Sequence, residues 1–393
     1  MSKIKNINEI NNIVFLFYLI IVLFLYFYFI QKYCIDYYLV NYAISDALIH
    51  YNGEFIRRGL LGTLLLSLSD IFKISLIFIV KYFFYFTYLI YFLIYYFFLK
   101  KLYVKNKLLL LFITLSPLGI LYPLYELESL LRKEIFFYIF FLFFLIILQK
   151  NYNEKIYYIY ISIALPILIL LHEGLVFFIP IFFLSWSIQK LKIGSEIKFK
   201  DIFISSITTI IVIIFHLKII FFGVNESYVD QMIVNLSNYD YEIKKFGAFF
   251  YLEKDFNFIY SIYDKLNFNH FTRFIILLLL SFLPLIYFFK KFNFYKKEIK
   301  ILLIFSLLSF CLIFFVALDW ARFLSLIFNL LIFFIVFSTK ICQIHFDTKF
   351  KNYYSILFIL IIYCTTWSPK TTFLEKINYL PPKDVIERII LYK

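Results

Sequence analysis

Residues 13–30 read IVFLFYLIIVLFLYFYFI, an apolar run of membrane-spanning length that holds no charged residue. A run of this length and composition is typical of a transmembrane helix. It is longer than the apolar core of a signal peptide, and no small-residue cleavage site follows it. We therefore expect this segment to remain in the protein as a membrane anchor.

Similar runs recur along the chain, whose 393 residues are 63% hydrophobic and have a mean hydropathy of +0.87. The pattern predicts an all-α fold, a polytopic integral membrane bundle of about 11 transmembrane helices in a single domain, 1–393. The expected spans are 13–30, 74–99, 108–124, 135–148, 156–171, 175–188, 202–222, 274–289, 301–317, 323–338 and 353–367.

The charge pattern sets the expected orientation. With the N-terminus in the cytoplasm, the cytoplasmic segments hold 20 lysines and only six acidic residues. This bias follows the positive-inside rule, so the net charge of +14 indicates membrane topology and not a nucleic-acid partner. The main extracytoplasmic segments are then 31–73, with a re-entrant or interfacial helix at 59–72, the large loop 223–273, and the interfacial tail 368–393, in which 381–393 forms an amphipathic helix.

The arginines are distributed differently from the lysines. The chain has 33 lysines and only six arginines, and all six arginines fall on the extracytoplasmic side of this topology. A composition that favours lysine should keep arginine where its planar, bidentate guanidinium is needed, above all for binding carboxylate or phosphate. Chance and ion pairing at helix ends are the alternative explanations.

Four charged clusters lie on that same side. They are GEFIRRG at 53–59, ELESLLRKE at 126–134, LHEGL at 171–175 and LDWARF at 318–323. In three of them an acid precedes an arginine by three or four residues, which on a helix places both on one face. Local salt bridges at an interface would explain each cluster alone, but four clusters on one side favour a shared polar cavity.

The pair His172–Glu173 interrupts the apolar sequence ILILLHEGLVFFIP. A carboxylate between apolar runs favours a buried or cavity-facing role, and Gly174 and Pro180 permit a chain break there. A short polar turn between two spans is the alternative interpretation. We expect no metal or other cofactor, because HExxH and related ligand spacings are absent. The four cysteines are far apart and form no CxxC, so they indicate neither a disulfide framework nor a metal site.

The stretch 131–184, from LRKEIFFYIFFLFFLIILQKN to ILILLHEGLVFFIPIFFL, resembles a hallmark segment of the EpsG-like and Wzy-type polysaccharide polymerases. Arg132, His172 and Pro180 match that pattern, whereas Glu173 replaces a small polar residue. The resemblance implies a glycosyltransferase-C-like bundle in the bacterial cytoplasmic (inner) membrane. It also implies a polyprenyl-diphosphate-linked oligosaccharide as substrate, contact with membrane lipid, and chain-length regulator and flippase proteins as partners.

The function that this resemblance implies is polymerisation of lipid-linked repeat units, as for O-antigen, capsule or exopolysaccharide. Single-sugar transfer from a polyprenyl-phosphate donor, and flipping or transport of lipid-linked sugars, are the alternatives. Departure of a diphosphate needs cationic donors, and attack by a hydroxyl needs a base. The expected diphosphate-binding residues are Arg57, Arg58, Arg132, Lys133 and Arg322, and the expected catalytic residues are Glu54, His172, Glu173 and Asp319.

Overall fold

The computed structural model describes the whole chain except residues 1, 37–41, 52–54, 101–106, 151–152, 196–197, 223–225, 240–246, 255, 265, 267, 292–296, 343–352, 371–377 and 392–393. The described residues are almost entirely helical, and one antiparallel pair of two-residue strands joins residues near the C-terminus. The helical fold agrees with the class predicted from the apolar runs.

The first half of the chain contains α1 (Ser2–Asp36), α2 (Tyr42–Ala47), α3 (Gly59–Phe72), α4 (Leu76–Leu99), α5 (Lys107–Leu115), α6 (Tyr122–Tyr125), the 3-10 helix η1 (Leu127–Ser129), α7 (Glu134–Gln149), α8 (Glu154–Leu171), the 3-10 helix η2 (Glu173–Phe178) and α9 (Pro180–Lys192). The second half contains α10 (Phe199–Phe222), α11 (Glu226–Ser237), α12 (Ala248–Leu252), α13 (Phe256–Tyr263), α14 (Phe268–Lys291), α15 (Lys297–Val316), α16 (Trp320–Cys342), α17 (Tyr353–Thr366), β1 (Trp367–Ser368), β2 (Asn378–Tyr379) and α18 (Pro381–Leu391).

Eight helical segments among the described residues are long and apolar enough to cross a membrane. They are Asn12–Lys32, Leu76–Leu99, Glu154–Leu171, Glu173–Lys192, Phe199–Leu217, Phe268–Ile286, Ile299–Val316 and Trp320–Ile341, and each overlaps a span expected from the sequence. The chain is therefore a polytopic helical membrane protein. Two further expected spans, 135–148 and 353–367, correspond to the shorter apolar helices α7 and α17.

The expected span 108–124 is not a single helix. Helix α5 ends at Leu115, a turn follows, and only the short helix α6 forms before residue 126. Pro117 accounts for the break, because the residue before a proline is driven out of the helical conformation. The broken segment leaves backbone carbonyls for side chains of other helices, and Leu118 O accepts hydrogen bonds from Ser325 and Asn329 of α16.

Helix α16 runs through the centre of the bundle, and every residue of its apolar window is buried. It packs against α7, α9 and α14, and α7 in turn packs against α4. By contrast, α10, α14 and α15 carry many exposed Ile, Leu and Phe side chains. Apolar surface on this scale is unfavourable in water and is expected where a helix faces lipid.

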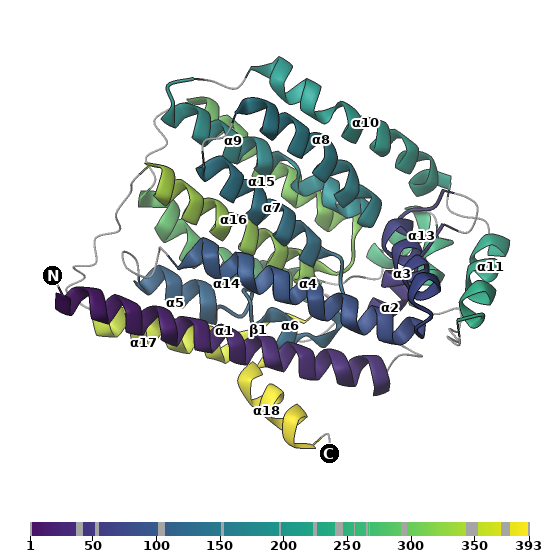
Figure 1. The fold of residues 1–393 in the computed structure, drawn as a ribbon, viewed down its shortest axis with the longest axis horizontal. Helices are drawn as coiled ribbons and strands as arrows, with labels where there is room; N and C mark the ends of the chain where they lie inside the picture. The colour runs from purple at the N-terminus through teal and green to yellow at the C-terminus, as the bar shows by residue number, and fades with distance from the viewer. Residues whose placement is uncertain are drawn as a thin grey trace.

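The elements α2, α3, α11 and α13 gather at the end of the bundle opposite to the N-terminus (Figure 1). We call this the outer end. Helix α3 covers the residues for which a short re-entrant or interfacial helix was expected. The segment 223–273 carries α11, α12 and α13 and is therefore largely helical where it is described. At the C-terminus, α18 begins at Pro381, as expected for an amphipathic helix, and lies beside the bundle (Figure 1).

Candidate functional site

The four charged clusters all meet near the outer end, because each lies where a helix begins or ends. Arg58 precedes α3, Lys133 precedes α7, Glu173 follows α8 and Asp319 precedes α16. The side chains form two neighbouring groups. We call them the Arg58 cluster (Asp46, Arg57, Arg58, Lys133 and Glu173) and the Arg322 cluster (Glu128, Arg132, Glu134, Asp319 and Arg322).

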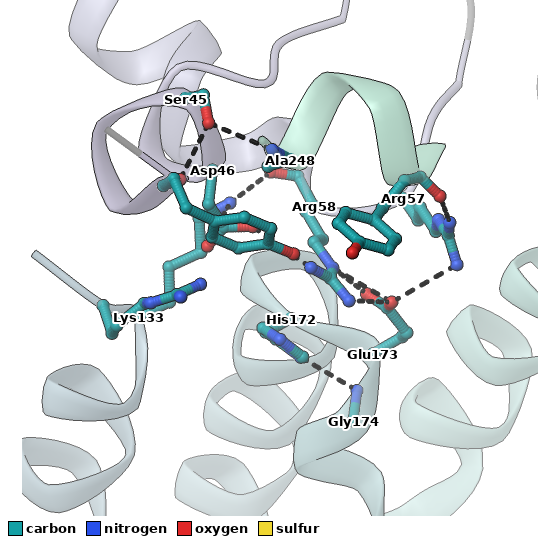
Figure 2. Close-up of polar contacts among 12 residues, drawn as sticks. Ser45, Asp46, Arg57, Arg58, Lys133, His172, Glu173, Gly174 and Ala248 are labelled. Carbon is teal, nitrogen blue, oxygen red and sulfur yellow. Dashed lines mark hydrogen bonds and ion pairs between the residues drawn. The ribbon is translucent and has the colours of Figure 1, made fainter. Parts of the chain in front are cut away.

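The Arg58 cluster is held by directed hydrogen bonds (Figure 2). Arg58 donates from Nη2 to Glu173 Oε1 at 2.7 Å and from Nε to Glu173 Oε2 at 2.8 Å, and its Nη1 reaches Asp46 Oδ1 at 3.2 Å. On the other side of Glu173, Arg57 Nη1 lies 3.7 Å from Oε1. This bidentate geometry is the strong form of an arginine–carboxylate pair and fastens α3 to the junction of α8 and α9.

The backbone of Arg58 adds to this constraint. Its φ of 66° lies in the left-handed region, which is unfavourable for a residue with a Cβ. Such a conformation costs on the order of 1–3 kcal/mol and persists only where surrounding contacts hold it. Its carbonyl accepts a 2.9 Å hydrogen bond from Lys133 Nζ, so side chain and backbone are both fixed.

Asp46 and Lys133 are fully buried partners, with 3.9 Å between Asp46 Oδ2 and Lys133 Nζ. Burial alone would raise the pKa of Asp46, but Lys133 and Arg58 hold that pKa well below its usual value. Burial lowers the pKa of Lys133 to about 8, against the opposing effect of Asp46. Lys133 therefore keeps its proton at neutral pH and begins to lose it in mildly alkaline solution.

His172 separates the helices α8 and η2. Its φ of −161° ends α8, and its Nδ1 accepts a 3.1 Å hydrogen bond from the backbone N–H of Gly174. Burial, and then Arg58, lower the pKa of His172 well below its ordinary value, so the ring is neutral. The helix break expected from the HEG sequence is thus present, and His172 caps the 3-10 turn that carries Glu173.

The side chains of the Arg322 cluster are joined mainly by ion pairs without well-aligned hydrogen bonds. Arg322 Nη2 lies 3.2 Å from Asp319 Oδ2, and Arg322 Nε lies 3.3 Å from Glu134 Oε1 without hydrogen-bond alignment. Arg132 Nη2 lies 3.8 Å from both Glu128 Oε2 and Asp319 Oδ2. The two arginines share Asp319, which couples the segment between η1 and α7 to the start of α16.

A pocket opens beside this cluster and encloses, with its mouth, about 450 Å³ of empty space. Arg132, Glu134 and Arg322 contribute charged groups to it. The remaining lining residues are polar or aromatic for the most part: Tyr26, Tyr88, Tyr91, Gly119, Ile120, Tyr122, Pro123, Ser129, Ile135, Tyr138, Ser325 and Asn329.

Several buried polar atoms of the lining residues have no hydrogen-bond partner among the described residues. Within this part of the chain, neither Arg132 Nη1 nor Arg322 Nη1 donates a hydrogen bond. Neither carboxylate oxygen of Glu134 accepts one there, and the hydroxyl of Tyr122 has no hydrogen-bond partner. Buried polar groups are almost always satisfied, so a group of orphaned donors and acceptors around one cavity indicates that water or a ligand satisfies them there.

The residues expected from the sequence divide between these two settings. Among the expected residues that the structure describes, only Arg132 and Arg322 line the pocket. The Arg58 cluster contains Arg57, Arg58, Lys133 and Glu173, and His172 directly precedes Glu173. Asp319 bridges the two pocket arginines. Glu54 lies outside the described residues. The expected pairs Glu128–Arg132 and Asp319–Arg322 are present.

Two carboxylates at the centre of the site were not singled out from the sequence. Asp46 stands alone in AISDALIH, and its signal was a single acid in an apolar stretch. Glu134 belongs to the quoted cluster ELESLLRKE, but its place at the start of α7 gave no reason to prefer it over Glu128. Within the part of the chain that the structure describes, no three His, Cys, Asp or Glu side chains lie together as a metal site would require.

Comparisons with protein-family models, with curated proteins and with solved structures found no match to this chain.

Proposed function

We propose that the protein is a membrane glycosyltransferase that polymerises polyprenyl-diphosphate-linked oligosaccharide repeat units at the extracytoplasmic face. The observation that carries the proposal is the pocket, which is lined by Arg132, Arg322 and the buried carboxylate of Glu134. Each of the two arginines has an Nη1 that donates no hydrogen bond among the described residues. Donors and an acceptor in a tyrosine-rich cavity match a ligand that combines sugar hydroxyls with an anionic group. We also propose that the bundle is of the glycosyltransferase-C kind, as the resemblance of the stretch 131–184 implies.

The chemistry follows from this placement. An acceptor hydroxyl attacks C1 of the lipid-linked sugar, and the bond from C1 to the diphosphate oxygen breaks with its electron pair on the diphosphate. Arg132 and Arg322 would stabilise the charge that develops on the leaving group, since donors fixed in a desolvated site are effective at this task. Exposed apolar helices beside the bundle would allow the polyprenyl chain to remain in lipid.

The Arg58 cluster has a different part in this proposal. Its arginines and lysine are engaged by Glu173, Asp46 and a backbone carbonyl, so a diphosphate would have to displace existing bonds to reach them. We therefore assign diphosphate binding to Arg132 and Arg322, and assign to Arg58 and Lys133 the task of holding the pocket-bearing segments in place.

Deletion of the gene in its bacterium, followed by gel analysis of the surface polysaccharide, tests the proposal. Loss of the repeat ladder with accumulation of a single-repeat product is expected, and the wild-type gene but not Arg132→Ala should restore the ladder. An unchanged ladder would contradict polymerisation. Mass spectrometry that finds one missing sugar in the product would instead establish a single-sugar transferase.

A further inference from the structure

The base for the proposed transfer needs a free proton-accepting atom in the pocket. His172 does not line the pocket, and its Nδ1 already accepts from the N–H of Gly174. Glu173 has both oxygens engaged by Arg58, and Asp46 accepts from Arg58 at one oxygen and faces Lys133 with the other. Neither Asp46 nor Glu173 is among the residues that line the pocket. These two carboxylates hold cations and are not placed to receive a proton from a substrate.

Asp319 and Glu128 are also poorly placed. Asp319 Oδ2 is shared by the guanidinium groups of Arg132 and Arg322, and the side chain of Glu128 is 46% exposed. Both lie outside the lining of the pocket. A carboxylate that reaches bulk water or is shared by two arginines has little capacity left to bind one substrate hydroxyl.

Glu134 differs from all of these. Among the described residues, it is the one acid side chain on the pocket lining, it is 5% exposed, and neither of its oxygens accepts a hydrogen bond. Arg322 lies beside Oε1, while Oε2 has no ion-pair partner in the described part of the chain. The residue also opens α7, where the partial positive charge of a helix N-terminus favours a carboxylate.

We infer that the tyrosine-lined pocket receives the acceptor sugar and that Glu134 is the catalytic residue that removes the proton from its attacking hydroxyl; this inference rests on the proposed function. The hydroxyl oxygen forms the new bond to C1 while the proton passes to the Glu134 carboxylate. The bond from C1 to the diphosphate breaks at the same step, and its electron pair leaves with the diphosphate. The rings of Tyr26, Tyr88, Tyr91, Tyr122 and Tyr138 supply faces and edges for the sugar ring.

The decisive variant is Glu134→Gln, which keeps the size of the side chain but cannot take a proton. A general base contributes about 10²–10⁴-fold in rate, so turnover of purified protein on extracted lipid-linked repeat units should fall by that factor. The KM should change by only a few-fold, because the amide still fits the pocket. Glu226→Gln is the matched control, since Glu226 also opens a helix near the outer end but is exposed, and it should leave turnover unchanged.

Azide separates a chemical role from a structural one, because the azide ion attacks C1 without losing a proton. Glu134→Gln should therefore form glycosyl azide from the same lipid-linked donor at the wild-type rate while it fails with the sugar acceptor. Loss of both reactions in this variant, or turnover within tenfold of wild type with the sugar acceptor, overturns the assignment of Glu134. A wild-type protein that transfers no sugar overturns the proposed function, and with it this inference.

Discussion

The Arg58 cluster and the Arg322 cluster lie side by side and hold similar residues, yet they are built differently. In the first, Arg58 donates four hydrogen-bond contacts to two carboxylates. In the second, Arg322 lies 3.2–3.3 Å from two carboxylates, and its Nε and Nη1 donate no hydrogen bond among the described residues. Charged side chains with hydrogen-bonded partners hold chain segments together. Charged side chains with unpaired donors beside a cavity are instead available to bind a ligand there.

Removing the acceptor of Arg58 should have the largest effect on stability. Glu173→Ala leaves a buried guanidinium without its bidentate partner and should lower the free energy of unfolding by about 3–5 kcal/mol. Thermal unfolding in detergent, followed by loss of the monodisperse peak on size-exclusion chromatography, measures this. Glu173→Gln should lower the free energy of unfolding by less, because the amide oxygen still accepts a hydrogen bond from Arg58. Equal stability of Glu173→Ala and wild type would show that the Arg58 cluster does not hold the fold.

Arg322→Lys should have the opposite effect: it should lower turnover and leave stability nearly unchanged. A lysine keeps the charge but loses the fixed fork of donors, and loss of one preorganised donor reduces turnover by about 10²–10³-fold. Its thermal unfolding should remain close to that of wild type, because few hydrogen bonds are lost. Arg273→Lys is the control, since Arg273 lies on α14 outside both clusters, and it should keep turnover. A polymerisation rate for Arg322→Lys equal to that of the control would contradict the role given to the Arg322 cluster.

The pKa of Lys133 predicts a moderate dependence of stability on pH. It falls from an ordinary 10.5 to about 8 in the folded protein, so between these values the unfolded chain binds more protons at this residue. The contribution of Lys133 to the free energy of unfolding therefore rises as the pH rises through this window. The unfolding temperature of wild type relative to that of Lys133→Met, measured from pH 7 to 10, should rise above pH 8. Parallel curves would mean that Lys133 is not perturbed.

The smallest effect is expected at Glu128. Its carboxylate is half-exposed and lies 3.8 Å from Arg132, so solvent screens the pair. Glu128→Gln should change the free energy of unfolding by less than about 1 kcal/mol, and the same melting assay would detect it. A loss as large as that of Glu173→Ala would show that the rim of the pocket carries as much of the fold as the Arg58 cluster does.

The sequence predicted local relationships well, and the reason is physical. Apolar runs of membrane length give helices whatever they pack against, and a three- or four-residue spacing brings Asp319 to Arg322 and Glu128 to Arg132. The break within 108–124 was missed, although Pro117 marks it, because the run is apolar on both sides.

Relationships between distant segments were not predictable from one sequence. The partner of Arg58 is Glu173, which lies 115 residues later, and no local spacing announces it. Asp46 and Glu134 gain their importance from burial beside Lys133 and Arg322, which depends on the packing of α2, α7 and α16. We expected the four clusters to lie close together. Their division into a hydrogen-bonded group and a pocket-lining group depends on tertiary packing, which one sequence does not reveal.

The most direct test compares Arg58→Lys with Arg322→Lys by the rate of sugar transfer per folded molecule, with the folded fraction taken from size-exclusion chromatography. We predict that Arg58→Lys yields less folded protein whose specific rate stays near that of wild type, whereas Arg322→Lys yields normal amounts of folded protein with a rate about 10²–10³-fold lower. Folded Arg58→Lys protein without activity, together with active Arg322→Lys protein, would contradict the division between the two clusters.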